Sequence, residues 1–192
     1  MVTGATGYIA SWIVHDLLQA GHTVYGSVRD LDQTQKHKHL LEMAEKAPGT
    51  LKLFEADLLI DGSFGEASKH CDYVLHTVSP FKIDVKNPQK KLVEPAVNGT
   101  ENVIRSALAS DRVQRIVVTS SVAAIYGDNQ DIQSKPDGRF GPEDWNTSSS
   151  LSHQAYSYSK TEAEKAARRL IEAQDEKDVV TIHPGFVLGP SL

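Results

Sequence analysis

Tyr156 and Lys160 stand four residues apart in the segment YSYSK. Residues at this spacing lie on the same face of a helix, so the phenol and the ammonium are expected to be neighbours. A phenol ordinarily loses its proton near pH ~10, and a nearby positive charge favours the phenolate. The spacing therefore predicts that Tyr156 exchanges a proton with a bound substrate and that Lys160 lowers its pKa. Tyr158 is the first alternative proton donor.

Hydroxyl-bearing residues follow an apolar run at the end of a second expected element. The run is Val117-Val118, and Thr119, Ser120 and Ser121 come directly after it. In open α/β sheets, ligands bind outside the carboxyl ends of the strands, where a hydroxyl can reach a substrate carbonyl. Serine and threonine are also ordinary turn residues, so a purely structural role stays open at this point.

The N-terminal segment 3–10, TGATGYIA, joins an expected strand to an expected helix. Gly4 allows a tight turn, Gly7 lets the backbone approach a pyrophosphate, and Ala10 permits close packing of helix on strand. The free N–H groups and the dipole of a helix N-terminus attract phosphate. The turn thus predicts a dinucleotide site, with Gly4, Thr6, Gly7, Tyr8 and Ile9 in contact with the cofactor.

The end of the second expected strand indicates which dinucleotide binds. An acidic residue there would bind a ribose 2′-hydroxyl, but the sequence has Arg29, whose guanidinium suits a 2′-phosphate. NADP(H) is therefore the expected cofactor. Lys36 is a candidate second cation or a solvated charge, and Asp30, which follows Arg29 directly, keeps NAD as an alternative.

Short β-rich runs alternate with amphipathic helical patterns, which predicts an α/β fold with a parallel sheet covered by helices. Strands are expected at Met1–Thr3, Thr23–Arg29, Leu51–Ala56, Tyr73–Thr77, Arg115–Ser120 and Val179–His183, and helices at Tyr8–Gln19, about Pro88–Ala109 and about Ser152–Ala173. The stretch Gly127–Ser150 shows no period and is expected to be a long functional loop.

Composition excludes several classes of protein. Twenty Lys and Arg against 25 Asp and Glu give a net charge of −5, with the cations scattered, so no nucleic-acid partner is expected. No apolar run is long enough for a membrane span. No signal peptide is evident, and the single cysteine, Cys71, fits a cytoplasmic protein. His37 and His39 lack further ligands at metal spacing, so they are expected to be solvated and no metal site is expected.

Taken together, these motifs resemble the extended short-chain dehydrogenase/reductases, in the branch of dihydroflavonol, cinnamoyl-CoA and fungal ketone reductases. The resemblance covers essentially the whole chain. It rests on TGATGYIA (3–10), GSVRD (26–30), ADLL (56–59), VLHTVSPF (74–81), PAVNGTENV (95–103), RIVVTSSVAAIYG (115–127), YSYSK (156–160) and HPGFVLGP (183–190).

The resemblance implies a doubly wound Rossmann sheet with flanking helices and a smaller substrate lobe. Residues 1–192 are then expected to be one NADP-binding domain, a fragment of a longer two-lobed reductase whose substrate lobe is largely missing. Ser121 becomes the catalytic serine beside Tyr156 and Lys160. The further cofactor contacts that the resemblance implies are Asp57, Leu58, Thr77, Val78, Ser79, Thr119, Pro184 and Val187.

The expected function is NADPH-dependent reduction of a small carbonyl compound, a ketone, aldehyde or dihydroflavonol, to an alcohol. Gln154-Ala155 stands where cinnamoyl-CoA reductases typically have Asn-Trp, which argues against a cinnamoyl-CoA substrate. The alternatives are a nucleotide-sugar epimerase or dehydratase, which uses the same three residues, and a dinucleotide-sensing module without catalysis. The sequence leaves the oligomeric state open.

Overall fold

The computed structural model describes residues 1–79 and 85–192. Pro80 and Phe81, which end the VLHTVSPF motif, lie outside the described residues. The strands are β1 (Thr23–Val28), β2 (Thr50–Glu55), β3 (Tyr73–His76), β4 (Arg115–Thr119) and β5 (Asp178–Ile182). The helices are α1 (Tyr8–Gln19), α2 (Thr34–Lys46), α3 (Gly65–Ser68), α4 (Glu94–Leu108) and α5 (Ala155–Glu172). Shorter helical turns are η1 (Gln89–Val93), η2 (Val122–Ala124) and η3 (Asn129–Ser134).

A short N-terminal segment joins the two halves of the sheet. β1 pairs with β2, β3 with β4 and β4 with β5, all in parallel. Between these halves, Val2 forms parallel bridges to Gly26 of β1 and to Leu75 of β3. The order across the sheet is therefore β2, β1, the segment at Val2, β3, β4 and β5. This is the doubly wound Rossmann order, so the predicted fold class is confirmed.

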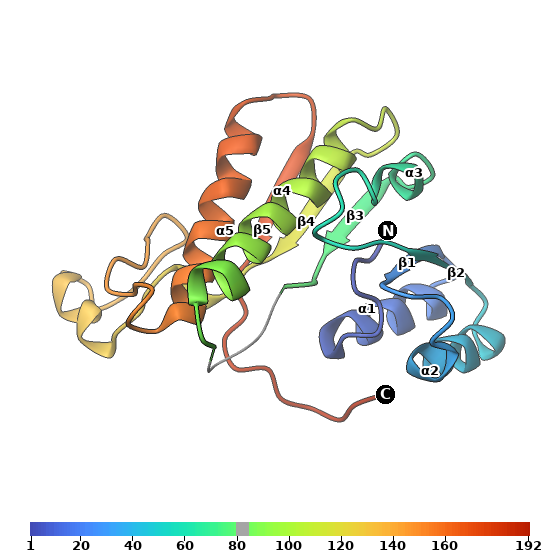
Figure 1. The fold of residues 1–192 in the computed structure, drawn as a ribbon, viewed down its shortest axis with the longest axis horizontal. Helices are drawn as coiled ribbons and strands as arrows, with labels where there is room; N and C mark the ends of the chain where they lie inside the picture. Colours follow the sequence, from blue (N-terminus) through green and yellow to red (C-terminus); the bar gives the residue numbers. More distant parts are fainter. Residues whose placement is uncertain (80–84) are drawn as a thin grey trace.

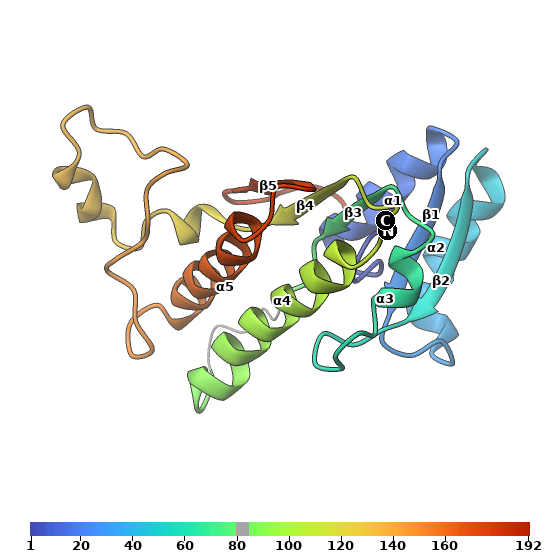
Figure 2. The same ribbon diagram turned by 90° about the horizontal axis from the view of Figure 1, so that it is seen from above.

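Helices cover both faces of this sheet (Figure 1). Figure 2 shows α4 and α5 side by side on the same face of β3 and β4. Because side chains alternate along a strand, Met1 packs in the apolar cluster that contains Val103 and Ile104 of α4. Its neighbour Val2 packs in the cluster that contains Val14 and Leu18 of α1. Two cores thus meet along one strand, so the sheet is buried on both faces there.

The structure differs from the sequence-based expectation at the start of one helix and in the burial of one histidine, and the expected strand Met1–Thr3 pairs only through bridges at Val2. The helix expected from about Pro88 to Ala109 begins with the π-helical turn η1, and α4 follows from Glu94. Pro95 stands at the start of α4 and lacks a backbone N–H, so the α-helical hydrogen-bond ladder cannot run through it. The expectation that His37 is solvated is wrong: it is 3 % exposed on the buried face of α2.

The carboxyl ends of the strands converge on one edge, and a buried asparagine fixes the loop after β2 there. Asn102 of α4 donates to the carbonyl oxygens of Leu58 at 3.2 Å and Ile60 at 2.8 Å. Its side-chain oxygen accepts from the N–H of Gly62 at 2.9 Å. This side chain therefore holds the Asp57–Leu58 segment against α4.

In residues 1–79 and 85–192, no helix is both long and apolar enough to cross a bilayer.

We predict that Asn102→Ala lowers the free energy of unfolding by about 1–3 kcal/mol, because it leaves two carbonyls and one N–H without their partner. Urea denaturation followed by circular dichroism measures this change. Asn98→Ala is the control, because Asn98 lies one turn earlier on α4 and is exposed. Equal effects of the two substitutions would contradict the assigned role of Asn102.

Candidate functional site

The N-terminal turn sits where the strand order reverses, between β1 and β3. Gly4 has a φ of +62°, and its N–H donates to Ser27 Oγ at 2.8 Å. The N–H of Ala5 donates to the carbonyl oxygen of Ser27 at 2.9 Å. Gly7 then caps the N-terminus of α1, whose first turn holds no acidic residue. The positive end of α1 is thus available to an anion, as the sequence predicts.

A cavity of about 520 Å³ opens beside this turn. The predicted cofactor residues that line it are Gly4, Thr6, Gly7, Arg29, Asp57, Leu58, Val78 and Ser79. The sequence analysis missed further lining residues, above all Lys91 of η1 and Phe64. No motif marks Lys91; only its place at the start of a helix facing the turn would have suggested it. The volume falls within the range of ligand pockets.

Arg29 and Asp30 take different positions at the end of β1. Arg29 is exposed and lines the cavity. The Asp30 carboxylate accepts from Gln33 Nε2 at 2.6 Å and from the N–H of Asp32 at 2.9 Å, and the hydrogen bond from Gln33 lowers its pKa. Asp30 therefore stabilises its own turn. Lys36 is exposed on α2, and the described lining of the cavity includes neither it nor Asp30.

Tyr156 and Lys160 lie on α5, as the spacing predicts. Lys160 Nζ is 5.9 Å from the centre of the Tyr156 ring. Lys160 is only 8 % exposed, and burial lowers its pKa to about 8, although the negative charge of Glu164 acts in the opposite direction. The expected depression of the tyrosine pKa is not found: burial raises the pKa of Tyr156. The reason is that the phenol is partly removed from water, which disfavours its charged form.

Ser121 lies at the carboxyl edge of the sheet, two residues after the end of β4. It caps η2, and its Oγ accepts from the N–H of Ala123 at 3.2 Å. The N–H of Val122 donates to the carbonyl oxygen of Pro184 at 3.1 Å, so Ser121 and Pro184 are brought together. Because η2 packs against α5, the serine belongs to the same region as Tyr156.

A buried histidine links the phosphate turn to this region. His76 Nδ1 is 3.0 Å from Thr3 Oγ1, and Nε2 is 3.3 Å from Thr100 Oγ1. Since Thr3 Oγ1 accepts from the N–H of Thr77 at 3.0 Å, its own hydrogen can be donated to Nδ1 of a neutral imidazole. Burial, and next the charge of Lys160, lower the pKa of His76 to about 3. The sequence signal for this contact is a histidine inside the apolar run VLHTV.

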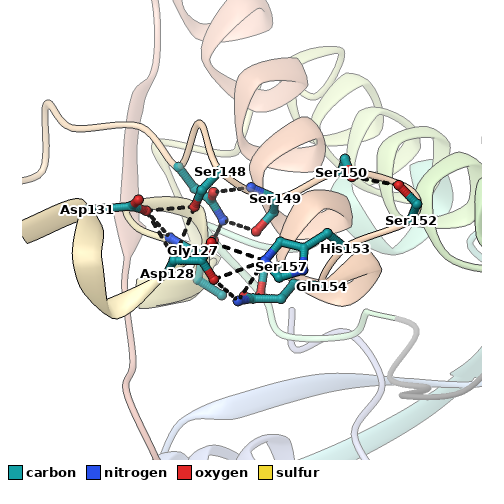
Figure 3. Close-up of polar contacts among 12 residues, drawn as sticks. Gly127, Asp128, Asp131, Ser148, Ser149, Ser150, Ser152, His153, Gln154 and Ser157 are labelled. Carbon is teal, nitrogen blue, oxygen red and sulfur yellow. Dashed lines mark hydrogen bonds and ion pairs between the residues drawn. The ribbon is translucent and has the colours of Figure 1, made fainter.

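The loop after η2 holds the start of α5 through a polar network (Figure 3). His153 Nε2 lies 2.9 and 3.1 Å from the two carboxylate oxygens of Asp128, and Gln154 Nε2 donates to Asp128 at 2.7 Å. Asp131 accepts from the N–H groups of Gly127 and Asp128. Gln154 adopts a left-handed φ of 52° directly before α5. The network therefore fixes the backbone at Gln154, where α5 begins, two residues before Tyr156.

The remaining predicted residues belong to several different elements. Tyr8 and Ile9 form the first turn of α1, and Thr77 donates from its Oγ1 to the carbonyl oxygen of Thr3 at 2.5 Å. Thr119 ends β4, and Val187 is 46 % exposed in the C-terminal segment. That segment returns to α1, where Trp12 Nε1 donates to the carbonyl oxygen of Pro190 at 3.0 Å (Figure 1).

A larger cavity of about 780 Å³ lies elsewhere, between the loop at Leu58–Gly65 and α4. Among the described residues, the lining of neither cavity contains Ser121, Tyr156 or Lys160, and that of the larger one also lacks Gly4, Gly7 and Arg29. The smaller cavity, which contains these glycines and Arg29, is therefore the one that fits a dinucleotide.

Comparison with known proteins finds one matching family model and several similar reductases. The family model described as the NAD dependent epimerase/dehydratase family matches residues 1–191. A cinnamoyl-CoA reductase of Medicago truncatula is 42 % identical over 194 residues, covering 100 % of this chain and 58 % of the relative. A dihydroflavonol 4-reductase of Gerbera hybrida is 36 % identical, covering 100 % of this chain and 52 % of the relative.

Among solved structures, yeast methylglyoxal/isovaleraldehyde reductase Gre2 complexed with NADPH superposes with a TM-score of 0.80 at 32 % identity. The match covers 100 % of this chain and 58 % of that one. The chain thus spans between half and three fifths of the length of the relatives described here.

We predict that Gly4→Ala costs about 1–3 kcal/mol of folding free energy. Alanine is strained at the positive φ of this position, and its Cβ would lie 2.7 Å from Val78 Cβ. Gly7→Ala is the matched control. The φ of Gly7 is −72°, and its nearest new contact is the Gly4 carbonyl oxygen at 3.2 Å. Thermal unfolding of both variants should show the larger loss at Gly4; the opposite order would refute this account of the turn.

Proposed function

Because the chain belongs to the NAD dependent epimerase/dehydratase family, we propose that it forms the cofactor-binding and catalytic part of an NADPH-dependent carbonyl reductase. The family match confirms the resemblance drawn from its motifs. The observation that supports the proposal is the glycine turn, which lines one cavity together with Arg29, at the carboxyl edge of the sheet beyond which Ser121 also lies.

The turn and the cavity beside it fit NADPH. The N-terminus of α1 would hold the pyrophosphate, and Arg29, which lines the same cavity, would hold the 2′-phosphate. Asp57 and Leu58, which also line the cavity, would hold the adenine. Lys91 adds a cation that the sequence analysis did not predict. Bound NADPH supplies a hydride to the carbonyl carbon of the substrate.

Tyr156 is proposed to donate the proton that converts the developing alkoxide to an alcohol. Because burial raises its pKa, the phenol is protonated at neutral pH, as a proton donor in reduction must be. Lys160 is proposed to bind the ribose hydroxyls and to favour the phenolate after proton transfer. Ser121 is proposed to orient the substrate carbonyl through its hydroxyl. Hydride on carbon and proton on oxygen complete the alcohol.

The substrate is proposed to be a small carbonyl compound. The relatives are named for cinnamoyl-CoA, dihydroflavonol and methylglyoxal reduction, which share transfer of a hydride to a carbonyl. Gln154-Ala155 before Tyr156 favours ketones and aldehydes over cinnamoyl-CoA, despite the 42 % identity with a cinnamoyl-CoA reductase. Nucleotide-sugar epimerisation and cofactor sensing without catalysis are the alternatives. A cytoplasmic location stays a prediction.

We predict that the protein binds NADPH more tightly than NADH and that Arg29→Ala removes most of the difference. A charge-assisted contact with the 2′-phosphate corresponds to roughly ten- to a hundredfold in affinity. Calorimetry with both cofactors measures it, and Lys36→Ala, an exposed cation outside the cavity lining, is the control. Equal affinities of the unmodified protein for the two cofactors would exclude the assignment of Arg29.

We predict that Tyr156→Phe lowers turnover of a test aldehyde or ketone by about 10²–10⁴-fold, since only the proton-donating oxygen is lost. NADPH affinity should change little. Tyr158→Phe, on the same helix, is the matched control and should stay near the unmodified rate. If the two variants exchanged these results, Tyr158 would be the donor; if the unmodified protein bound NADPH and reduced no carbonyl compound, the sensing alternative would be favoured.

A further inference from the structure

Glu164 is a buried acid on α5, one helical turn after Lys160, and it is 2 % exposed. Three side chains donate to its carboxylate. Ser120 Oγ donates to Oε2, and His183 Nε2 lies 2.8 Å from both oxygens. Arg168 donates to Oε1 through Nε at 3.2 Å and through Nη2 at 2.9 Å. The carboxylate is thus fully enclosed by donors.

Each donor belongs to a different part of the site. Ser120 directly precedes Ser121 at the end of β4, and His183 directly precedes Pro184 after β5. The Glu164 carboxylate therefore joins α5, which carries Tyr156 and Lys160, to the two strand ends that face it.

The third donor extends the network to the loop after η2. Arg168 Nη2 donates to the carbonyl oxygen of Pro142 at 2.6 Å, and its guanidinium carbon lies 4.7 Å from the centre of the Trp145 ring. Arg168 thus connects the Glu164 carboxylate to the loop after η2 at Pro142. The same loop contacts the start of α5 through Asp128.

A buried acid of this kind is stable as an anion only if its hydrogen bonds replace those with water. Burial alone would raise the pKa of Glu164, but the hydrogen bonds from Ser120, His183 and Arg168 outweigh it and hold the pKa below its usual value. The group is therefore an anion at neutral pH, buried in the same helix face as the Lys160 ammonium.

We propose that Glu164 is a positioning residue, which fixes Lys160 relative to Ser121 and Pro184 and places a buried negative charge one helical turn from the Lys160 ammonium. The positions it sets matter through the roles proposed above, so this inference rests on the proposed function. Glu164 itself does not touch the reacting atoms; it acts through Lys160 and through the strand ends.

The charged and titratable groups around Lys160 and Glu164 determine whether the pKa of Lys160 rises or falls when the charge of Glu164 is removed. Lys160 faces Tyr156 and Glu164 on its own helix and His76 from β3. Glu164 faces Arg168 on α5 and His183 after β5. Of these groups, Glu164 supplies the negative charge that opposes the effect of burial on Lys160. Removing that charge should therefore lower the pKa of Lys160 further below about 8.

The test is Glu164→Gln, read by the pH dependence with which an amine-reactive anhydride labels Lys160, quantified by mass spectrometry of the digested protein. We expect the midpoint of Lys160 labelling to fall by about one pH unit, a tenfold change in its protonation equilibrium. Glu162→Gln is the matched control, because Glu162 lies two residues away and pairs with Lys165 at 2.9 Å. An unchanged Lys160 midpoint in folded Glu164→Gln would overturn the proposal.

Glu164→Asp decides the matter if the glutamine variant does not fold. The charge is retained, but the shorter side chain no longer spans the distance to Ser120 and His183 together. We expect the Lys160 midpoint to stay near that of the unmodified protein, while kcat falls about tenfold or more and the KM for NADPH changes little. A shifted Lys160 midpoint with unchanged kcat would overturn the positioning role.

The labelling measurement needs no turnover and no carbonyl substrate. A failure to find any reduced compound would therefore count against the proposed function alone, whereas the Lys160 midpoint reports on Glu164 in either case. The two inferences are distinguishable.

Discussion

The site depends on the pairing of Val2 with strands on both sides. Its backbone N–H donates to the carbonyl oxygen of Tyr25 at 2.8 Å, and that of Thr3 donates to the carbonyl oxygen of Leu75 at 3.0 Å. A strand that pairs in parallel with two neighbours whose connections run to opposite sides leaves a gap beyond its carboxyl end. The glycine turn leaves the sheet at that point, so the cavity and the positive end of α1 follow from this one pairing.

Three ionisable groups lie near this edge of the sheet, and burial alone would favour the neutral form of each. Lys160, Glu164 and His76 are all at most 8 % exposed, and they come from two elements of the sheet and its covering helices. His76 avoids the cost of a buried charge by staying neutral between two threonine hydroxyls. Glu164 remains charged because three donors surround it. For Lys160 the two effects oppose each other: burial lowers its pKa and the charge of Glu164 raises it, and the result is a pKa of about 8.

Sequence pattern alone predicts the elements that repeat with a clear period. The helix at Tyr8–Gln19 has the predicted bounds because its apolar residues recur at helical spacing and Gly21 ends it. The strands differ by a residue or two at their ends, where pairing rather than composition decides the boundary. The burial of His37 was not predictable, because it arises where α2 packs against α1 and β2. The π-helical turn at Gln89–Val93 was missed although its cause, Pro95 at the start of α4, is local.

In the candidate site too, residues within one local element are predictable from the sequence, and residues brought together by distant contacts are not. Glycines with a fixed backbone role and the pair Tyr156 and Lys160 are found from local spacing, because a turn and a helix are local structures. Spacing places Glu164, and not Glu162, on the helix face of Lys160. It does not show that Glu164 is buried among hydrogen-bond donors, whereas Glu162 pairs with a partly exposed lysine. Only the sheet brings Ser120 and His183 to one of these two acids, so the distinction between a buried network and a surface ion pair belongs to the fold and not to the motif.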